Sequence, residues 1–222
     1  TGAGLKEIKE GTAVYTKNGE EDTLDGDAIL LATGRGPNTE GLHAERAGVE
    51  LTKRGAVVTD KHLRTSAETI WAAGDVCGNL QFTYISLDDS RIILSDKQGD
   101  GSRTTENRGA FAYSVFMEPS FSRAGLSEKE AADKGLNYRV VRMNTDMIPK
   151  AKVLRKTTGM LKAVIDKDSG KILGAALFCP ESYEIINMVK LAMDHDLDYT
   201  VLRDFIYTHP TMSEGLNDLF AL

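Results

Sequence analysis

Two residues near the end of the chain, His209 and Glu214, could carry out acid–base chemistry. They bracket the segment HPTMSE at residues 209–214. An imidazole exchanges a proton near neutral pH, and a carboxylate that accepts its other ring N–H would orient it and stabilise its protonated form. A structural interpretation competes, because Thr211 and Glu214 have the spacing of a helix capping box and Pro210 suits a first helical turn. Spacing alone favours the structural role.

A second segment, Ala73-Gly74-Asp75, could contact a ligand that carries hydroxyl groups. It follows an apolar run at residues 69–73 that predicts a strand. Small residues let a bulky ligand approach the backbone, and ligands of open α/β sheets bind at the carboxyl ends of strands. Alternatively, Asp75 only caps the turn that follows.

The first half of the chain must position this second segment. The apolar run at residues 28–32 is typical of a strand buried on both faces, and Gly34, Arg35 and Pro37 break the chain after it. Residues 97–107 are rich in glycine, serine and charge, which predicts an exposed loop between domains. The pattern predicts strands over 11–15, 23–33, 55–59 and 69–73, a turn over 17–20, a short helix over 44–47 and a helix over 84–96.

The second half must position His209 and Glu214, and its pattern predicts an α+β arrangement. Ser127 and Glu130 form a capping-box pattern that predicts a helix ending at Gly135. The pattern predicts strands over 110–117, 138–144, 159–166 and 172–178, and further helices over 182–195, 198–205 and from Pro210 to Phe220.

Three motifs occur in order: ATGRGPN at residues 32–38, AAGD at 72–75 and HPTMSE at 209–214. This series resembles the pyridine nucleotide-disulfide oxidoreductases, which include dihydrolipoamide dehydrogenase, glutathione reductase and mercuric reductase. The resemblance implies an α/β fragment of flavin- and nicotinamide-binding domains followed by an α+β dimerisation domain, an antiparallel sheet with flanking helices. It places the tail of the nicotinamide-binding domain at residues 1–35, the C-terminal part of the FAD-binding domain at 36–108 and the dimerisation domain at 109–222.

The resemblance also implies roles for single residues. Asp75, with Ala73 and Gly74, would contact the ribityl chain of FAD, and the segment of Gly34 and Arg35 would return the chain to the flavin domain. His209, oriented by Glu214, would face the redox disulfide of a partner subunit and move the proton that accompanies thiol exchange. With the resemblance, this dyad is favoured over the capping role. FAD and NAD(P)H would be the cofactors, and the parent enzyme a homodimer.

Several family features are absent from the sequence: two GxGxxG loops and a CxxxxC pair. The chain starts at Thr1 within a strand pattern, so we expect an internal start and a chain that is inactive alone. Cys77 and Cys179 lie far apart in sequence, and we expect both to be small buried residues rather than a redox pair or metal ligands. Tyr207-Thr208 and residues 87–91 also depart from the family, which indicates a less-characterised bacterial branch and leaves the electron acceptor open.

Composition restricts the other possibilities. The formal net charge of -6 argues against a nucleic-acid partner, and no run approaches the roughly 20 apolar residues of a membrane helix. Few cysteines and no leader pattern predict a cytoplasmic protein. Two functional alternatives remain: a stand-alone dimerisation or interaction module, and a disulfide-free NAD(P)H flavoenzyme such as a metal reductase.

Overall fold

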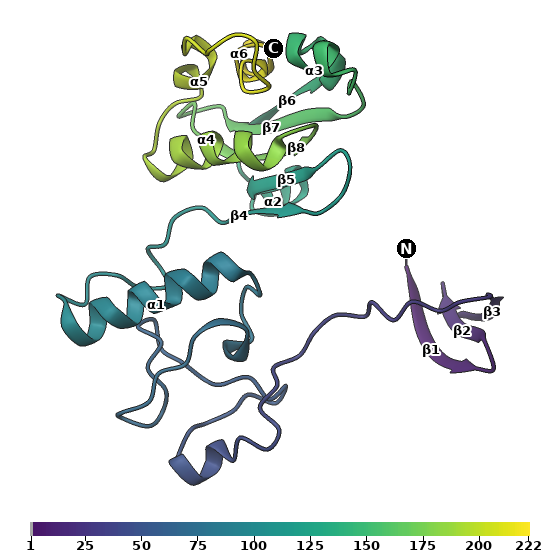
Figure 1. Cartoon of the computed structure of the whole chain (residues 1–222), viewed down its shortest axis with the longest axis vertical. Coiled ribbons are helices and arrows are strands. Elements are labelled where there is room, and N and C mark those ends of the chain that lie inside the picture. The colour runs from purple at the N-terminus through teal and green to yellow at the C-terminus, as the bar shows by residue number, and fades with distance from the viewer. Residues whose placement is uncertain (1) are drawn as a thin grey trace. The chain divides into compact units, whose positions relative to one another are not determined.

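The computed structural model describes residues 2–222, and the chain divides into two compact units (Figure 1). Unit 1 holds the residues up to Asp60 together with Arg64–Leu87, and unit 2 holds Lys61–Leu63 and Asp88–Leu222.

Unit 1 begins with a three-stranded antiparallel meander of β1 (Ala3–Lys9), β2 (Thr12–Lys17) and β3 (Glu20–Asp25). Asn18 and Gly19 join β2 to β3 with φ values of 54° and 86°. Two consecutive positive φ angles are typical of the tight turns whose twist matches paired strands. The turn predicted at residues 17–20 is therefore confirmed.

The strand predicted over residues 23–33 is wrong beyond Asp25. Residues 28–33 form no regular structure, and Leu30 keeps 88% of its surface exposed. No strand pairs with this run within residues 2–222. An extended segment without hydrogen-bonded neighbours does not become part of a sheet, however apolar it is.

The rest of unit 1 is held by short elements. These include two 3₁₀ turns, η1 (Ala44–Ala47) and η2 (Gly74–Cys77). The first confirms the short helix predicted over residues 44–47. The strands predicted at 55–59 and 69–73 are wrong, because they reduce to the single bridges Leu51–Val57 and Arg64–Trp71. Helix α1 (Thr83–Gln98), whose residues from Asp88 onward belong to unit 2, confirms the helix predicted over 84–96.

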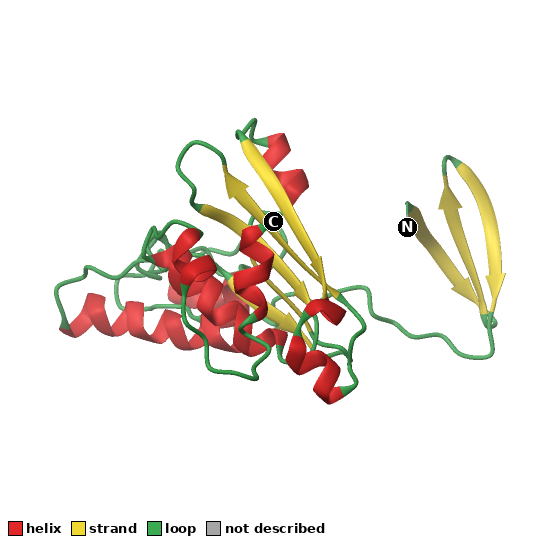
Figure 2. Cartoon of the chain, turned by 90° about the horizontal axis from the view of Figure 1, so that it is seen from above, coloured by secondary structure: helices red, strands yellow, loops and turns green. Residues whose placement is uncertain are grey.

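Unit 2 is built on a five-stranded antiparallel sheet in the order β4-β5-β8-β7-β6, whose strands lie side by side in Figure 2. The pattern predicted β6 and β8 at the bounds that the structure shows, and β4 and β7 within a few residues, but it missed β5. The strands are β4 (Ala112–Val115), β5 (Phe121–Gly125), β6 (Tyr138–Asn144), β7 (Met160–Asp166) and β8 (Ile172–Phe178).

Helices cover one face of this sheet. Helix α4 packs on β5 and β8, and α6 packs on β6 and β7. Because side chains alternate between the faces of a strand, Leu161, Ala163 and Leu177 point to the covered face and are fully buried. The helices of unit 2 are α2 (Glu128–Asp133), α3 (Pro149–Leu154), α4 (Ser182–Asp194), α5 (Thr200–Asp204) and α6 (Gly215–Ala221), with a 3₁₀ turn η3 (Thr145–Met147).

Helix α2 lies on the opposite face, and its start shows the predicted capping box. The Ser127 hydroxyl accepts the Glu130 N–H at 3.1 Å, and the Glu130 carboxylate accepts the Ser127 N–H at 2.7 Å. Gly135 follows the helix with a φ of 66°, a conformation that glycine adopts without steric cost. No helix among the described residues is long and apolar enough to span a membrane.

Candidate functional site

The structure brings His209 and Glu214 into direct contact. Nδ1 of His209 lies 2.8 Å from Oε2 of Glu214. The imidazole is 70% exposed, whereas the Glu214 side chain is only 15% exposed. The carboxylate is thus fixed in the protein while the far edge of the ring faces outward.

The segment between α5 and α6 sets this geometry. The Thr211 hydroxyl donates to the carbonyl of Thr208 at 2.8 Å and accepts the N–H of Glu214 at 3.3 Å. Helix α6 starts at Gly215, so the helix predicted from Pro210 is wrong over its first turn. Thr211 serves that turn, but the Glu214 carboxylate bonds to His209 instead of completing a capping box. Thr211 therefore caps the start of the helix, and Glu214 orients His209.

The contact determines which ring nitrogen is available. A carboxylate only accepts hydrogen bonds, so Nδ1 of His209 must carry the proton shared with Glu214. Nε2 is then the nitrogen that can accept or release a proton toward a reactant. The second carboxylate oxygen, Oε1 of Glu214, is buried and has no hydrogen-bond partner in the described part of the chain. The arrangement suits general acid–base catalysis by an oriented imidazole.

The Ala73-Gly74-Asp75 segment opens onto the surface of unit 1. The Val57 N–H donates to the Val76 carbonyl at 2.9 Å and holds η2 against the preceding segment. Gly74 is buried with a φ of 74°, and a Cβ there would lie 2.8 Å from the Ser86 hydroxyl. Ala73 and Asp75 are exposed.

This local structure fits a ligand with hydroxyl groups. The Asp75 carboxylate forms no hydrogen bond or ion pair with the residues that the structure describes, and the residues before it are small. Ala73 and Asp75 are both exposed, as contact with a polyol chain requires.

Gly34 and Arg35 are also exposed, and the structure does not bring them into contact with Asp75. Gly34 has a φ of 111°, and the position of a Cβ there has no neighbour within 4 Å. Pro37 does approach η2, since its Cγ lies 3.9 Å from the Cβ position of Gly78. The loop thus reaches the flank of η2 through Pro37.

Two cavities were not predicted from the sequence. The first, of about 360 Å³, is in unit 1 and is lined by apolar residues that include Val49, Val57, Ile70, Trp71 and Ala72. Its lining extends to Ala73, next to Asp75. The residues that line this cavity have no regular spacing in the sequence, so a search for sequence patterns could not find it.

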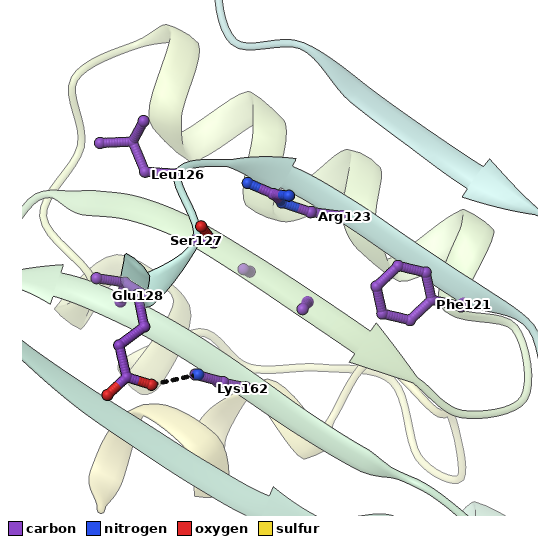
Figure 3. Close-up of a pocket in the computed structure, with 9 residues that line it drawn as sticks. Phe121, Arg123, Leu126, Ser127, Glu128 and Lys162 are labelled. Carbon is purple, nitrogen blue, oxygen red and sulfur yellow. Dashed lines mark hydrogen bonds and ion pairs between the residues drawn. The ribbon is translucent and has the colours of Figure 1, made fainter. Parts of the chain in front are cut away.

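The second cavity, of about 190 Å³, lies on the face of the sheet opposite α4 (Figure 3). Glu128 borders it and accepts hydrogen bonds from Lys162 at 2.5 Å and from Arg142 at 2.8 Å. The bond from Lys162 is the main cause that lowers the pKa of the Glu128 carboxyl. The charges in this cavity are paired internally, so it has no strong preference for an ion.

The two cysteines are buried thiols, as expected. Burial raises the pKa of Cys179 to about 12, which keeps it protonated and unreactive near neutral pH. Among residues 2–222 no group of three or more histidine, cysteine, aspartate or glutamate side chains is arranged to hold a metal ion.

Comparisons with known proteins match this organisation. A family model described as the pyridine nucleotide-disulphide oxidoreductase dimerisation domain matches residues 111–220. A second, described as pyridine nucleotide-disulphide oxidoreductase, matches residues 1–90. The chain belongs to the pyridine nucleotide-disulphide oxidoreductase family. Enzymes of this family are FAD-dependent oxidoreductases that use NAD(P)H.

Similar family members are bacterial. A protein of Escherichia coli K12 named "Probable pyridine nucleotide-disulfide oxidoreductase RclA" is 51% identical over 203 residues, which cover 91% of this chain and 46% of that protein. The mercuric reductase of Staphylococcus aureus is 36% identical over 207 residues, or 92% of this chain and 38% of that protein. The chain therefore spans less than half the length of these curated relatives.

Solved structures agree with the fold. The HOCl-induced flavoprotein disulfide reductase RclA from E. coli superposes with a TM-score of 0.85 at 48% identity, over 96% of this chain and 49% of that one. Its Cu(II) complex superposes with a TM-score of 0.86 at 47% identity, over 97% of this chain and 48% of that one. The antiparallel sheet with flanking helices is thus the dimerisation fold of this oxidoreductase family.

Proposed function

We propose that this chain supplies the dimerisation domain, part of the flavin site and an acid–base dyad to an FAD-dependent NAD(P)H:disulfide oxidoreductase. The 2.8 Å hydrogen bond between His209 and the largely buried Glu214 carries this proposal. The boundaries at residues 35 and 108, the homodimer and the inactivity of the chain alone are parts of the same proposal.

The dyad has a defined task in such a reaction. Bound FAD would pass on the two electrons delivered by the reduced nicotinamide cofactor. Conversion of a disulfide to two thiols takes up two electrons and two protons. A hydride supplies both electrons but only one of the two protons. His209 can deliver the second proton through Nε2, while Glu214 holds the Nδ1 side and stabilises the imidazolium.

Asp75 has a binding task in the same proposal. Its accessible carboxylate can accept hydrogen bonds from ribityl hydroxyls, and the exposed Ala73 leaves room for the cofactor beside the backbone. We expect Asp75→Ala in the full-length protein to weaken FAD retention, measured as the ratio of flavin to protein absorbance after dialysis. Asp60→Ala lies outside this segment and should leave the ratio unchanged.

The test of the dyad uses the full-length protein. Substitution His209→Gln should lower kcat about 10²- to 10⁴-fold, the usual contribution of a general acid or base. His195, an exposed histidine with no acidic partner in the described residues, gives the matched control His195→Gln. Equal activities of the two variants would contradict the proposal.

A thiol count tests the acceptor class. Anaerobic addition of the reduced nicotinamide cofactor should bleach the flavin band and reveal two new alkylatable thiols. Bleaching without new thiols would identify a disulfide-free flavoenzyme, such as a metal reductase, and would remove the task assigned to His209.

A further inference from the structure

Asn217 lies on α6, one turn after Glu214, and joins two elements that flank the acid–base segment. Its side-chain amide donates toward three carbonyls at the end of α5: Leu202 at 3.2 Å, Arg203 at 2.7 Å and Phe205 at 3.0 Å. Carbonyls at the end of a helix lack intrahelical partners and must be satisfied from elsewhere. Asn217 supplies these hydrogen bonds from a different helix.

The same residue is tied to the other end of the segment. The backbone N–H of Asn217 donates to the carbonyl of Glu214 at 3.0 Å. Asn217 therefore forms hydrogen bonds at both ends of the loop of residues 206–214, with the end of α5 on one side and with Glu214 on the other. A loop whose two ends are fixed has fewer conformations available than one fixed at a single end.

Tyr207 strengthens this junction from within the loop. Its hydroxyl donates to the Leu202 carbonyl at 3.1 Å, so that carbonyl accepts from both Tyr207 and Asn217. The Tyr207 ring packs edge-on against Phe205 with centroids 4.9 Å apart. Burial raises the pKa of Tyr207 to about 12, so the phenol remains a donor throughout the neutral range. Tyr207 precedes His209 by only two residues, so this anchored ring lies close to the imidazole along the chain.

We propose that Asn217 is the positioning residue of the acid–base dyad: by fastening the end of α5 to α6, it holds His209 in hydrogen-bonding register with Glu214. This inference rests on the proposed role of His209 for its catalytic consequence, but its structural part stands independently. An exposed imidazole has little packing of its own to fix it, so its orientation depends on the backbone that carries it.

The test combines a spectroscopic and a kinetic measurement. In the 222-residue chain labelled with ¹⁵N-histidine, long-range ¹H–¹⁵N correlations at alkaline pH report which ring nitrogen of His209 carries the proton. We expect a predominant Nδ1–H tautomer in the wild type and a mixture in Asn217→Ala and in the isosteric Asn217→Asp, which lacks the amide donor. The neighbouring exposed residue gives the control Asp218→Asn, which should retain the wild-type tautomer.

The kinetic arm uses the full-length protein. Loss of register should lower kcat about 10- to 100-fold in the Asn217 variants, with KM for the nicotinamide cofactor unchanged, since small displacements of a catalytic group are costly. Slow amide exchange in β7 and β8 verifies that each variant is folded. If the Asn217 variants fail this check, Tyr207→Phe removes one hydroxyl from the same junction, and it should show the same tautomer mixture to a smaller extent.

The outcomes separate the two proposals. A wild-type tautomer ratio in folded Asn217→Ala and Asn217→Asp would overturn the positioning role, whatever the activity does. A mixed tautomer with unchanged kcat would support positioning and refute the proton-transfer task of His209. A mixed tautomer with reduced kcat would support both.

Discussion

Two arginines pair with adjacent carboxylates of α1, and their removal tests how burial determines the contribution of an ion pair to stability. Arg108 donates to Asp89 at 2.7 Å and also lies 3.4 Å from Asp88, while Arg103 donates to Asp88 at 2.5 Å. The Arg108 side chain is 15% exposed and the Arg103 side chain 49% exposed. The two guanidinium groups thus make similar contacts in different surroundings, and we predict very different costs for their removal.

Burial determines the size of each effect. Removing one partner of a buried ion pair typically costs about 3–5 kcal/mol. The half-exposed Arg103 is screened by water, and Asp88 keeps its contact with Arg108 when Arg103 is removed, so this pair contributes about 0–1 kcal/mol. We therefore expect Arg108→Met to destabilise the packing of α1 by about 3–5 kcal/mol, because it removes a mostly buried guanidinium that contacts both Asp88 and Asp89. The matched Arg103→Met should cost less than about 1 kcal/mol.

Native-state amide hydrogen exchange of α1 measures this difference. At about 1.4 kcal/mol per factor of ten, Arg108→Met should speed the exchange of protected α1 amides about 100- to 1000-fold or more. Arg103→Met should change these rates by less than about fivefold. Exchange in β7 and β8 serves as the internal reference. Equal acceleration in the two variants would refute the argument that burial, rather than contact distance, sets the contribution of these pairs.

Three further predictions follow from unit 2. Leu161→Ala removes a fully buried side chain of the central sheet and should cost about 2–5 kcal/mol, seen as a lower denaturation midpoint. Hydrogen bonds from Ser127 lower the pKa of Glu130 to about 2; its stabilisation of α2 is thus complete above about pH 4.5 and is lost as the pH falls toward 2, a change that Glu130→Gln should abolish. Cys179 should resist iodoacetamide at pH 8 in the folded chain and react after unfolding, and rapid labelling of the folded chain would contradict its burial.

The sheet of unit 2 could be predicted from sequence because its strands carry their own signal. The patterns at 138–144 and 172–178 give β6 and β8 at their observed bounds. β5 was missed because Phe121–Gly125 mixes serine, arginine and glycine with few branched apolar residues. It becomes a strand through pairing with β4 and β8 on its two sides. The hydrogen bonds from these two neighbouring strands make β5 a strand although its own sequence has little strand propensity.

Unit 1 shows the opposite error. The apolar run at 28–32 has a strong strand signal, yet it stays exposed and irregular because no described strand pairs with it. Strand propensity expresses how well side chains pack on a pleated, half-buried surface, so it has no effect where that surface is missing. The same applies to residues 69–73, which keep only the bridge between Arg64 and Trp71.

The role of the acid–base segment could not be assigned from spacing, because Glu214 is correctly placed for two different roles. Thr211 and Glu214 stand where a capping box requires them, and His209 and Glu214 stand where a dyad requires them. A capping box needs the Glu214 carboxylate to reach back to the Thr211 N–H, whereas the structure directs it to Nδ1 of His209. Thr211 alone then serves the helix start, through its bond to the Glu214 N–H. Because the helix does not depend on that carboxylate, Glu214→Gln should impair proton transfer while leaving α6 folded, the combination that a capping residue would not produce.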